Sequence, residues 1–315
     1  MFNHYTVLKN EVIDSLEIKK DGVYVDATAG GGGHSKSILS HLSTNGLLVC
    51  FDQDEVAIKH LTEKFKGNKN VLIIKSNFKN LAFKLEEHNI LKIDGIVFDL
   101  GLSSMQIDEA QRGFSYMNEG KLDMRMDQNI SLTAFDIVNT YSEQELRNIF
   151  NKYGEERFSS LYAKAIIDKR AQREIISTLE LSELIKKTIP DKFKYKLTSH
   201  PAKRVFQALR IEVNNELNFF ESTLQKIFNL LKLNGIISII TFHSLEDKIC
   251  KYYFKKYSTL SEELNAIPEV PENLLPIGIE VNNKPILPSK EELAENSRSN
   301  SAKLRVFKKV RDEDI

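Results

Sequence analysis

Cysteine is scarce in this sequence: Cys50 and Cys250 are the only two in 315 residues. Neither belongs to a Cys-x-x-Cys pair, so the pattern predicts neither a disulfide framework nor a cysteine-based zinc site, and it suits a reducing compartment. The 7 histidines also lack metal-ligand spacing such as His-x-x-x-His. We therefore predict that the protein has no metal site.

Long apolar runs are absent as well. No uninterrupted stretch approaches the roughly 20 apolar residues that a membrane-spanning helix needs. The segment from Met1 to Leu16 lacks the basic head and apolar run that mark a secretory signal. Because the hydrophobic fraction of 41% and the charged fraction of 28% are ordinary for a globular protein, we expect a soluble, cytoplasmic chain.

An excess of charge of one sign is also missing, since Lys+Arg and Asp+Glu both number 44. The total therefore does not indicate nucleic-acid binding, and any RNA contact must come from a local basic cluster. The best cluster consists of Lys192, Lys194, Lys196, His200, Lys203, Arg204 and Arg210, with Phe193, Tyr195 and Phe206 among them. Such a run is either a phosphate-binding surface or simply a solvated helix surface.

Short β-branched apolar runs alternate with helical patterns through the first hundred residues. The runs are Val23–Thr28, Leu47–Phe51, Val71–Lys75 and Ile93–Leu100. Strands separated by helices in this way predict parallel pairing through right-handed crossovers. Two more apolar runs, at 236–242 and 304–310, resume the pattern near the end of the chain. The fold class is therefore α/β, with a doubly wound, Rossmann-like sheet.

A helical insertion interrupts this pattern. From about 106 to 203 there are helix signals but no convincing strand, and both Ser142 with Glu145 and Ser177 with Glu180 have capping-box spacing. We predict a discontinuous α/β domain at 1–105 and 204–315, and an inserted all-helical domain at 106–203. The insertion is the candidate for RNA recognition.

The segment after the insertion predicts one long helix. Pro201 suits a first helical turn, apolar residues recur at three- and four-residue steps as far as Leu231, and Asn234-Gly235 is expected to end the helix. Five of the seven prolines lie between Pro268 and Pro288, which predicts an irregular, loop-rich segment.

Four consecutive glycines, Gly30 to Gly33, connect the first predicted strand to the first helix after it. Glycines let a backbone turn sharply and approach a ligand without a Cβ in the way. A dinucleotide fingerprint needs a third Gly or Ala, but Ser35 or Lys36 stands at that position. A P-loop needs Gly directly before Lys-Ser, and this sequence has Ser35 there. The turn therefore predicts a nucleotide-like ligand without a pyrophosphate.

Acidic residues end three of the predicted strands: Asp26, Asp52 and Asp99. Asp52 follows Gly33 by 19 residues, the position from which an acidic side chain commonly accepts both ribose hydroxyls of an adenosine. Carboxylates at Asp26 and Asp99 would favour a cationic ligand at the same edge of the sheet. S-adenosylmethionine carries a ribose, a sulfonium and an ammonium group, and has no pyrophosphate, so it is the cofactor that this pattern predicts.

Several short motifs give the sequence a more specific resemblance. They include Asp26-Ala-Thr-Ala-Gly-Gly-Gly-Gly-His-Ser and Asp94-Gly-Ile-Val-Phe-Asp-Leu-Gly-Leu-Ser-Ser, and others begin at His4, Phe51, Arg112, Leu122, Tyr153, His200, Phe242 and Asn296. In this order and spacing they resemble the RsmH (MraW) family of 16S ribosomal RNA cytosine-N4 methyltransferases. The resemblance runs nearly end to end and implies a class I methyltransferase fold with a helical insertion.

The resemblance also implies a substrate and a set of site residues. Members of the family methylate N4 of cytosine 1402, in the standard numbering of 16S rRNA, on the small ribosomal subunit. By motif position the cofactor contacts are Gly32, Gly33, His34, Asp52, Phe78, Asp99 and Gln106. Asp26 is added from its place at a strand end.

Asp99 is the candidate catalytic residue, because it stands where amino-methylating enzymes place their key polar group. The usual (Asp/Asn/Ser)-Pro-Pro-aromatic motif is absent, and Asp99-Leu-Gly-Leu-Ser-Ser replaces it. Two roles for Asp99 therefore stay open: orienting the target amine, or contacting the cofactor alone. A flipped cytosine would also need aromatic surfaces. Phe114 and Tyr116 are either those surfaces or core residues of the insertion, whereas His243 and Glu246 are read as structural partners.

Three other functions compete with this hypothesis. A nicotinamide-dependent oxidoreductase would share the glycine turn and Asp52, but the missing third glycine disfavours it. A ribosome-assembly factor that senses S-adenosylmethionine without turnover would use the same pocket. A methyltransferase with DNA or a small amine as its substrate would keep the enzyme class, although the large insertion favours a macromolecule.

Overall fold

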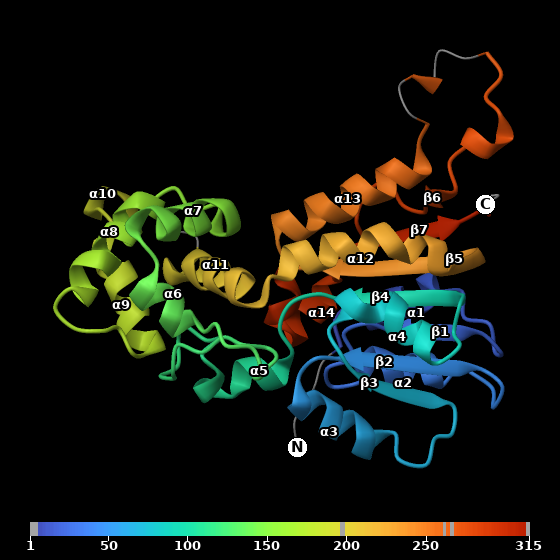
Figure 1. The fold of residues 1–315 in the computed structure, drawn as a ribbon, viewed down its shortest axis with the longest axis horizontal. Helices are drawn as coiled ribbons and strands as arrows, with labels where there is room; N and C mark the ends of the chain where they lie inside the picture. Colours follow the sequence, from blue (N-terminus) through green and yellow to red (C-terminus); the bar gives the residue numbers. More distant parts are fainter. Residues whose placement is uncertain (1–5, 196–198, 261–262, 265–267, 313–315) are drawn as a thin grey trace. The chain divides into compact units, whose positions relative to one another are not determined.

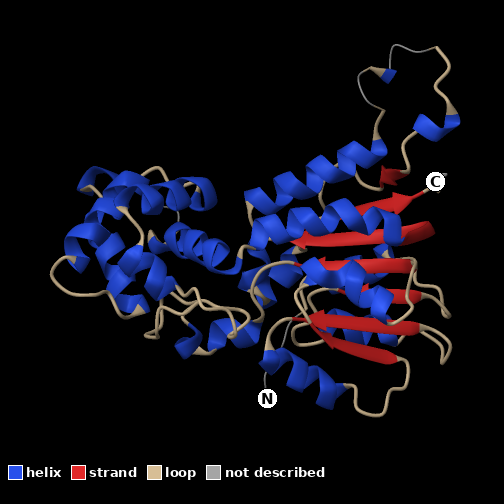
Figure 2. Cartoon of the chain, viewed as in Figure 1, coloured by secondary structure: helices blue, strands red, loops and turns tan. Residues whose placement is uncertain are grey.

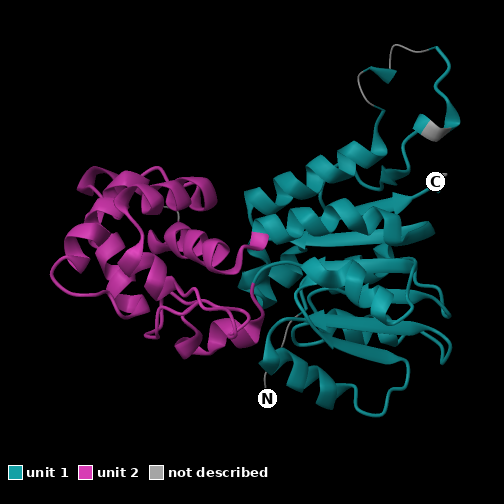
Figure 3. Cartoon of the chain, in the orientation of Figure 1, with its two compact units in different colours: residues 1–101, 217–315 teal, residues 102–216 magenta. Residues whose placement is uncertain are grey.

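The computed structural model describes residues 6–195, 199–260, 263–264 and 268–312. The chain forms two compact units (Figure 3). Met1–Gly101 and Leu217–Ile315 make up the first, called here the sheet unit, and Leu102–Glu216 make up the second, the helical unit. The strands of the sheet all belong to the sheet unit, whereas helices and loops build the helical unit (Figure 2).

The sheet has seven strands in the order β3-β2-β1-β4-β5-β7-β6 (Figure 1). Their bounds are β1 Val23–Asp26, β2 Leu47–Asp52, β3 Val71–Lys75, β4 Ile93–Asp99, β5 Leu231–Thr241, β6 Gly278–Glu280 and β7 Lys303–Lys309. Strands β1 to β5 pair in parallel, while β7 runs antiparallel to both β5 and β6. The α/β fold class and the positions of the first four strands are confirmed; β6 lies in the proline-rich segment and was not predicted.

Helices cover both faces of this sheet. Their bounds are α1 Lys9–Ser15, α2 Gly33–Leu39, α3 Glu55–Lys64, α4 Leu81–Glu87, α12 Glu216–Leu230, α13 Ser244–Ser258 and α14 Lys290–Glu295, with short 3-10 turns η1 Phe78–Asn80, η4 Glu272–Leu274 and η5 Ser297–Ser301. Successive strand residues belong to two separate hydrophobic cores. Val25 lies in the core formed with α4, α12 and α13, and its neighbour Tyr24 lies in the core formed with α1, α2 and α3. Each fully buried Phe or Leu in these cores contributes roughly 1.5–3 kcal/mol.

The prediction of one long helix after Pro201 is wrong. The structure has two helices there, α11 Ala202–Asn214 and α12, which are separated at Asn215. Asn215 has φ 52°, a left-handed conformation that asparagine tolerates better than most residues and that ends a helix. Asn234-Gly235 does not end the helix either: β5 begins at Leu231, and its register against β4 shifts between Leu231 and Ile236, so the pair lies in an irregularity of that strand.

The helical unit is built from α5 Ser104–Asp108, η2 Ala110–Arg112, α6 Ala134–Thr140, α7 Glu143–Gly154, α8 Ser159–Arg170, α9 Thr178–Thr188, α10 Asp191–Lys194 and α11. Its core is apolar, with Phe150, Tyr162 and Leu209 almost fully buried. Ser142 and Glu145 form the predicted capping box, and the Ser177 side chain accepts the Glu180 N–H at the start of α9.

The boundaries of the helical unit differ from the expected 106–203. Helix α11 belongs to this unit because it packs closely against α7. The two backbones approach so closely that a Cβ on Gly154 of α7 would lie only 2.8 Å from the Arg204 carbonyl oxygen of α11. The sequence assigned that helix to the α/β domain because its apolar spacing continues without interruption into α12.

Candidate cofactor and catalytic site

The topology of the sheet creates a ligand-binding edge at β1 and β4. The chain leaves β1 toward β2 on one side, and β4 lies on the other side, so the order reverses between β1 and β4. Ligands of open α/β sheets bind at the carboxyl ends of strands beside such a reversal. Asp26, Asp52 and Asp99 are the last residues of β1, β2 and β4.

The glycine turn between β1 and α2 is closely packed. Gly30 and Gly32 have φ values of 48° and 68°, a conformation that glycine adopts without strain. A Cβ on Gly32 would lie 2.8 Å from Leu61 Cδ2, and a Cβ on Gly33 would overlap Thr6 Oγ1. No side chain larger than hydrogen fits at Gly33 unless the N-terminal segment moves.

Asp52 ties the end of β2 to the glycine turn. Its Oδ2 accepts the Gly30 N–H at 2.8 Å, and its Oδ1 accepts the Asp54 N–H at 2.8 Å. Burial raises the pKa of Asp52 to about 6, although the two hydrogen bonds partly offset this rise. Since each carboxylate oxygen can accept two hydrogen bonds, both oxygens keep capacity for ribose hydroxyls.

Asp26 is buried directly beneath the turn. Its Oδ2 accepts the Ser35 hydroxyl at 2.6 Å, and its Oδ1 accepts the Thr28 N–H at 3.3 Å. Burial raises the pKa of Asp26 to about 6 even though these donors oppose the rise. A cationic group beside Asp26 would therefore be stabilised as the carboxylate ionises.

Asp99 has the most perturbed carboxyl group of the three. Its N–H donates to Thr28 Oγ1 at 2.7 Å, which joins the ends of β4 and β1. Its Oδ1 is inaccessible to solvent and has no hydrogen-bond partner among the described residues, and its Oδ2 lies 3.7 Å from His34 Nδ1. Burial, followed by the charges of Asp26, Glu246 and Glu292, raises the pKa of Asp99 to about 8. A strongly shifted carboxyl at a sheet edge is typical of a functional site.

His34 and Phe78 lie on segments that follow the strand ends. His34 is buried in the first turn of α2, and its Nε2 is 3.0 Å from the Val7 carbonyl oxygen. Phe78 begins η1, three residues after β3, and its ring makes an edge contact with Phe98, with centroids 5.8 Å apart. The Phe78 carbonyl accepts the Thr223 hydroxyl at 3.3 Å, which ties η1 to α12.

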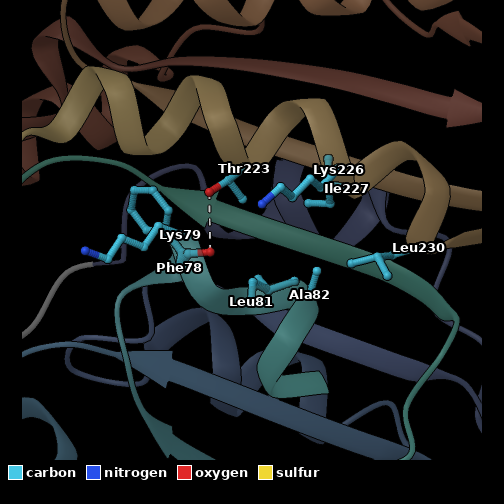
Figure 4. Close-up of a pocket in the computed structure, with 8 residues that line it drawn as sticks. All are labelled: Phe78, Lys79, Leu81, Ala82, Thr223, Lys226, Ile227 and Leu230. Atoms are coloured by element: carbon cyan, nitrogen blue, oxygen red, sulfur yellow. Dashed lines mark hydrogen bonds between the residues drawn. The ribbon is translucent and has the colours of Figure 1, made fainter. Parts of the chain in front are cut away.

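A shallow pocket of about 180 Å³ lies beside Phe78, between η1 with α4 and α12 (Figure 4). Apart from Phe78 it is lined by apolar residues, Thr223 and the lysines Lys79 and Lys226, and none of the three strand-end carboxylates faces it. This pocket has no carboxylate that would bind a sulfonium, so the carboxylates at the edge of the sheet remain the candidate cofactor site.

Gln106 belongs to the helical unit. There it is buried, and its Oε1 accepts the Ser103 N–H at 3.1 Å in a capping box at the start of α5. The other implied contacts belong to the sheet unit. Sequence reasoning assigned no role to Thr28, Ser35 or Glu292. Thr28 and Ser35 lie within the glycine-turn motif, and their hydroxyls bond to the Asp99 N–H and to Asp26, whereas Glu292 belongs to none of the quoted motifs and accepts the Leu8 N–H.

The two residues read as structural have that role. His243 caps α13, and Glu246 Oε2 accepts the Phe242 and His243 N–H groups at 2.8 and 3.2 Å.

The aromatic candidates lie within the helical unit. Phe114 is buried, and the half-buried Tyr116 stacks on His200 with ring centroids 4.8 Å apart, so both rings contribute to packing.

The basic cluster is only partly available for a ligand. Arg210 Nε is paired with Glu216 at 2.8 Å, and Lys194 is paired with Asp191 at 2.6 Å. Arg204 is exposed, with one guanidinium nitrogen donating to the Glu155 carbonyl at 2.7 Å, and Lys203 is exposed beside it. Lys196 lies outside the described residues.

The residues at the sheet edge fit S-adenosylmethionine. Three carboxylates converge there with raised pKa values, and no described residue bonds to Asp99 Oδ1, so a cation would relieve their mutual repulsion. Asp52 beside the glycine turn suits a ribose, and the turn fits a ligand without a pyrophosphate. A parallel sheet with an added antiparallel β7, together with this site, defines a class I methyltransferase.

The chain belongs to the MraW methylase family, whose profile matches residues 1–310. It is 51% identical over 314 residues to ribosomal RNA small subunit methyltransferase H of Streptococcus mutans, covering 99% of both chains. Among solved structures, an rRNA methylase from Streptococcus thermophilus is 12% identical, with TM-score 0.43 and coverage of 96% of this chain and 95% of that one. A Streptococcus mutans protein in complex with SAH is 14% identical, with TM-score 0.40 and coverage of 97% and 99%.

Within the described ranges, no cluster of three or more His, Cys, Asp or Glu side chains has the geometry to hold a metal ion. None of the helices in that part of the chain is both long and apolar enough to cross a membrane.

Proposed function

We propose that the protein is a cytoplasmic S-adenosylmethionine-dependent methyltransferase that methylates N4 of a cytosine in 16S rRNA of the small subunit, at position 1402. Membership of the MraW methylase family and 51% identity to a ribosomal RNA small subunit methyltransferase support the substrate. The observation that carries the chemistry is the cluster of Asp26, Asp52 and Asp99 around the glycine turn, because it offers both a ribose contact and a place for a cation.

The proposed cofactor contacts are divided by chemistry. Asp52 would accept the ribose hydroxyls, the backbone at Gly32 and Gly33 would approach the ligand closely, and the Phe78 ring would contact the adenine. Asp26 and Asp99 would face the positive charges, and His34 and Gln106 would be further cofactor contacts. When bound, S-adenosylmethionine supplies the methyl group, which leaves the sulfonium sulfur as it bonds to N4.

Asp99 is proposed to act on the target amine. The N4 amine of cytosine is a poor nucleophile, because its lone pair is delocalised into the ring. The Asp99 side chain is 23% exposed, so its carboxylate can accept a hydrogen bond from N4 and hold the lone pair toward the methyl group. Positioning of this kind supplies several kcal/mol of barrier reduction, and general-base assistance adds roughly 10²–10⁴-fold.

The helical unit is proposed to recognise the RNA. Lys203 and Arg204 are exposed on α11, and the exposed Arg157 lies over the rings of Phe158 and Phe193 at 4.5 and 4.7 Å. Cationic groups of this kind bind phosphates, and guanidinium and aromatic planes stack on unpaired bases. This surface replaces the larger basic cluster predicted from the sequence, because Arg210 and Lys194 are already paired.

The test of this function uses methyl-labelled S-adenosylmethionine and small ribosomal subunits that lack the modification. After incubation with the purified protein, the RNA is digested and its labelled nucleosides are identified by mass spectrometry. Label in N4-methylcytidine at a single site is the expected outcome. Cofactor binding without any label in RNA would contradict the proposal and favour a non-catalytic assembly factor.

A further inference from the structure

A buried hydroxyl holds the Asp26 carboxylate beneath the glycine turn. Ser35 lies in the first turn of α2 and is 0% exposed, and its hydroxyl donates to Asp26 Oδ2 at 2.6 Å. Asp26 itself is 1% exposed, and its Oδ1 accepts the Thr28 N–H at 3.3 Å. Because neither side chain reaches solvent, a ligand at this edge of the sheet would sense the charge of Asp26 across packed atoms.

The hydrogen bonds through Ser35 run in one direction. The Cys50 thiol donates to Ser35 Oγ at 3.4 Å, and burial raises the pKa of this thiol to about 12, so the thiol keeps its proton at neutral pH. The Ser35 hydroxyl therefore accepts from Cys50 and gives its own hydrogen to Asp26. A hydroxyl that donates to a carboxyl group favours the ionised form of that group, and a chain of such bonds strengthens the preference.

The charged groups that face Asp26 come from β2, β4 and α3. Asp52 at the end of β2 and Asp99 at the end of β4 are acids, and the charge of Asp26 raises the pKa of both. Lys64 on α3 favours ionised Asp26 by its charge, while its hydrogen bond goes to the Gly31 carbonyl at 2.6 Å. Burial disfavours the ionised form of Asp26, and the Ser35 hydroxyl has the largest effect among the contacts that oppose burial.

We propose that Ser35 is a positioning residue that acts through Asp26, holding this carboxylate ionised so that the site prefers a cationic ligand. The inference rests on the proposed placement of S-adenosylmethionine at this edge of the sheet. S-adenosylmethionine carries a sulfonium and an ammonium group, S-adenosylhomocysteine keeps only the ammonium, and methylthioadenosine has neither. Because a poorly hydrated interior screens charge weakly, ionised Asp26 should favour the three ligands in that order.

The first test replaces Ser35 with alanine and measures S-adenosylmethionine binding by calorimetry over a range of pH. Loss of a donor to the ionised form should raise the pKa of Asp26 by about one unit from its value of about 6. More of Asp26 is then neutral at mildly acid pH, so the affinity of Ser35→Ala should be about fivefold lower than that of the unaltered protein near pH 6. The difference should disappear near pH 8.5, where Asp26 is ionised in both proteins.

Two further ligands and one variant are the controls. Ser35→Ala should weaken S-adenosylhomocysteine less than S-adenosylmethionine, and should leave methylthioadenosine nearly unaffected. Ser40→Ala removes an exposed hydroxyl just after α2, which donates to the Ser37 carbonyl at 2.7 Å, and should bind all three ligands like the unaltered protein. Equal losses for the three ligands would overturn the proposal, because Ser35 would then only shape the turn. Unchanged S-adenosylmethionine binding at pH 6 would overturn it as well.

A second measurement combines Ser35→Ala with Asp26→Asn, whose side chain is neutral at every pH. If Ser35 acts through the charge of Asp26, adding Ser35→Ala to Asp26→Asn should leave S-adenosylmethionine affinity unchanged. Methylthioadenosine binding shows that both variants are folded. A loss in the double variant as large as that caused by Ser35→Ala alone would overturn the proposal. Failure of the unaltered protein to bind S-adenosylmethionine would instead count against the proposed cofactor site itself.

Discussion

Two carboxylates, Asp123 in the helical unit and Asp99 in the sheet unit, have opposite surroundings. In the helical unit, Arg125 donates to both carboxylate oxygens of Asp123 and to two main-chain carbonyls, at 2.8 to 3.0 Å. At the edge of the sheet unit, Asp99 has an inaccessible oxygen that bonds to no residue in the described part of the chain. Burial raises the pKa of both Asp99 and Asp123, but hydrogen bonds from Arg125 bring the pKa of Asp123 below its ordinary value, whereas that of Asp99 rises to about 8.

The contrast shows which charges are structural and which await a ligand. A paired and hydrogen-bonded charge stabilises the fold, and removing its partner leaves an uncompensated group. A carboxylate held among other carboxylates is costly in the free protein, and that cost is recovered only when a cation or a proton donor arrives. Each of the following substitutions tests one side of this comparison.

The largest effect is expected at Asp99. Asp99→Ala should lower kcat about 10²–10⁴-fold, equivalent to about 3–5 kcal/mol of transition-state stabilisation, because the amine loses its acceptor. Binding of S-adenosylhomocysteine, followed by calorimetry, should weaken far less. Equal losses in the rate and in cofactor affinity would leave Asp99 as a cofactor contact only.

Arg125→Ala should instead affect stability. Breaking the contacts to Asp123 and to the carbonyls should lower the free energy of unfolding by about 2–3 kcal/mol, measured by urea denaturation, with cofactor affinity unchanged. Arg125→Lys is the matched variant, because it keeps the charge but cannot make the bidentate contact. Its free energy of unfolding should lie between those of the unaltered protein and Arg125→Ala. A loss of cofactor affinity in Arg125→Ala would contradict the prediction that this ion pair stabilises the fold without affecting the cofactor site.

Charge reversal at Lys203 and Arg204 should weaken binding to the small subunit. Two phosphate contacts replaced by repulsion predict a loss of about tenfold or more at low salt, and the difference should shrink as salt rises. Lys251→Glu, at an exposed lysine of α13 in the sheet unit, is the control. Filter binding that is unchanged at every salt concentration would exclude this surface as an RNA contact.

The smallest effect is a pH dependence of stability. Because the folded-state pKa of Asp99 is raised to about 8 from an ordinary 3.8, the fold favours its protonated form. The associated stability is fully present at low pH and is lost as pH rises toward 8. Between about pH 6 and pH 8.5, the Tm should therefore fall about 2–4 °C further in the unaltered protein than in Asp99→Asn. Parallel Tm curves would contradict the raised pKa.

Much of the sheet unit could be predicted from the sequence because its signals are local. Strands β1 to β4 appear as apolar runs, and the predicted ends of β1, β2 and β4 lie within two residues of Asp26, Asp52 and Asp99, the last residues of those strands. The break at Asn215 could not be predicted, since apolar spacing runs through both helices and the left-handed residue is set by packing. Three-residue β6 exists only because β7 pairs with it.

The candidate site divides in the same way. By itself the sequence determined the glycine turn, the three strand-end carboxylates and hence a cofactor with a ribose and positive charge, because each depends on a few neighbouring residues. Only the tertiary structure decided that the Val7 carbonyl oxygen lies against His34 Nε2 and that Glu292 accepts the Leu8 N–H. Those contacts join residues 27 and 284 positions apart, and the energy of ordering such distant groups is supplied by the whole packed core rather than by any local pattern.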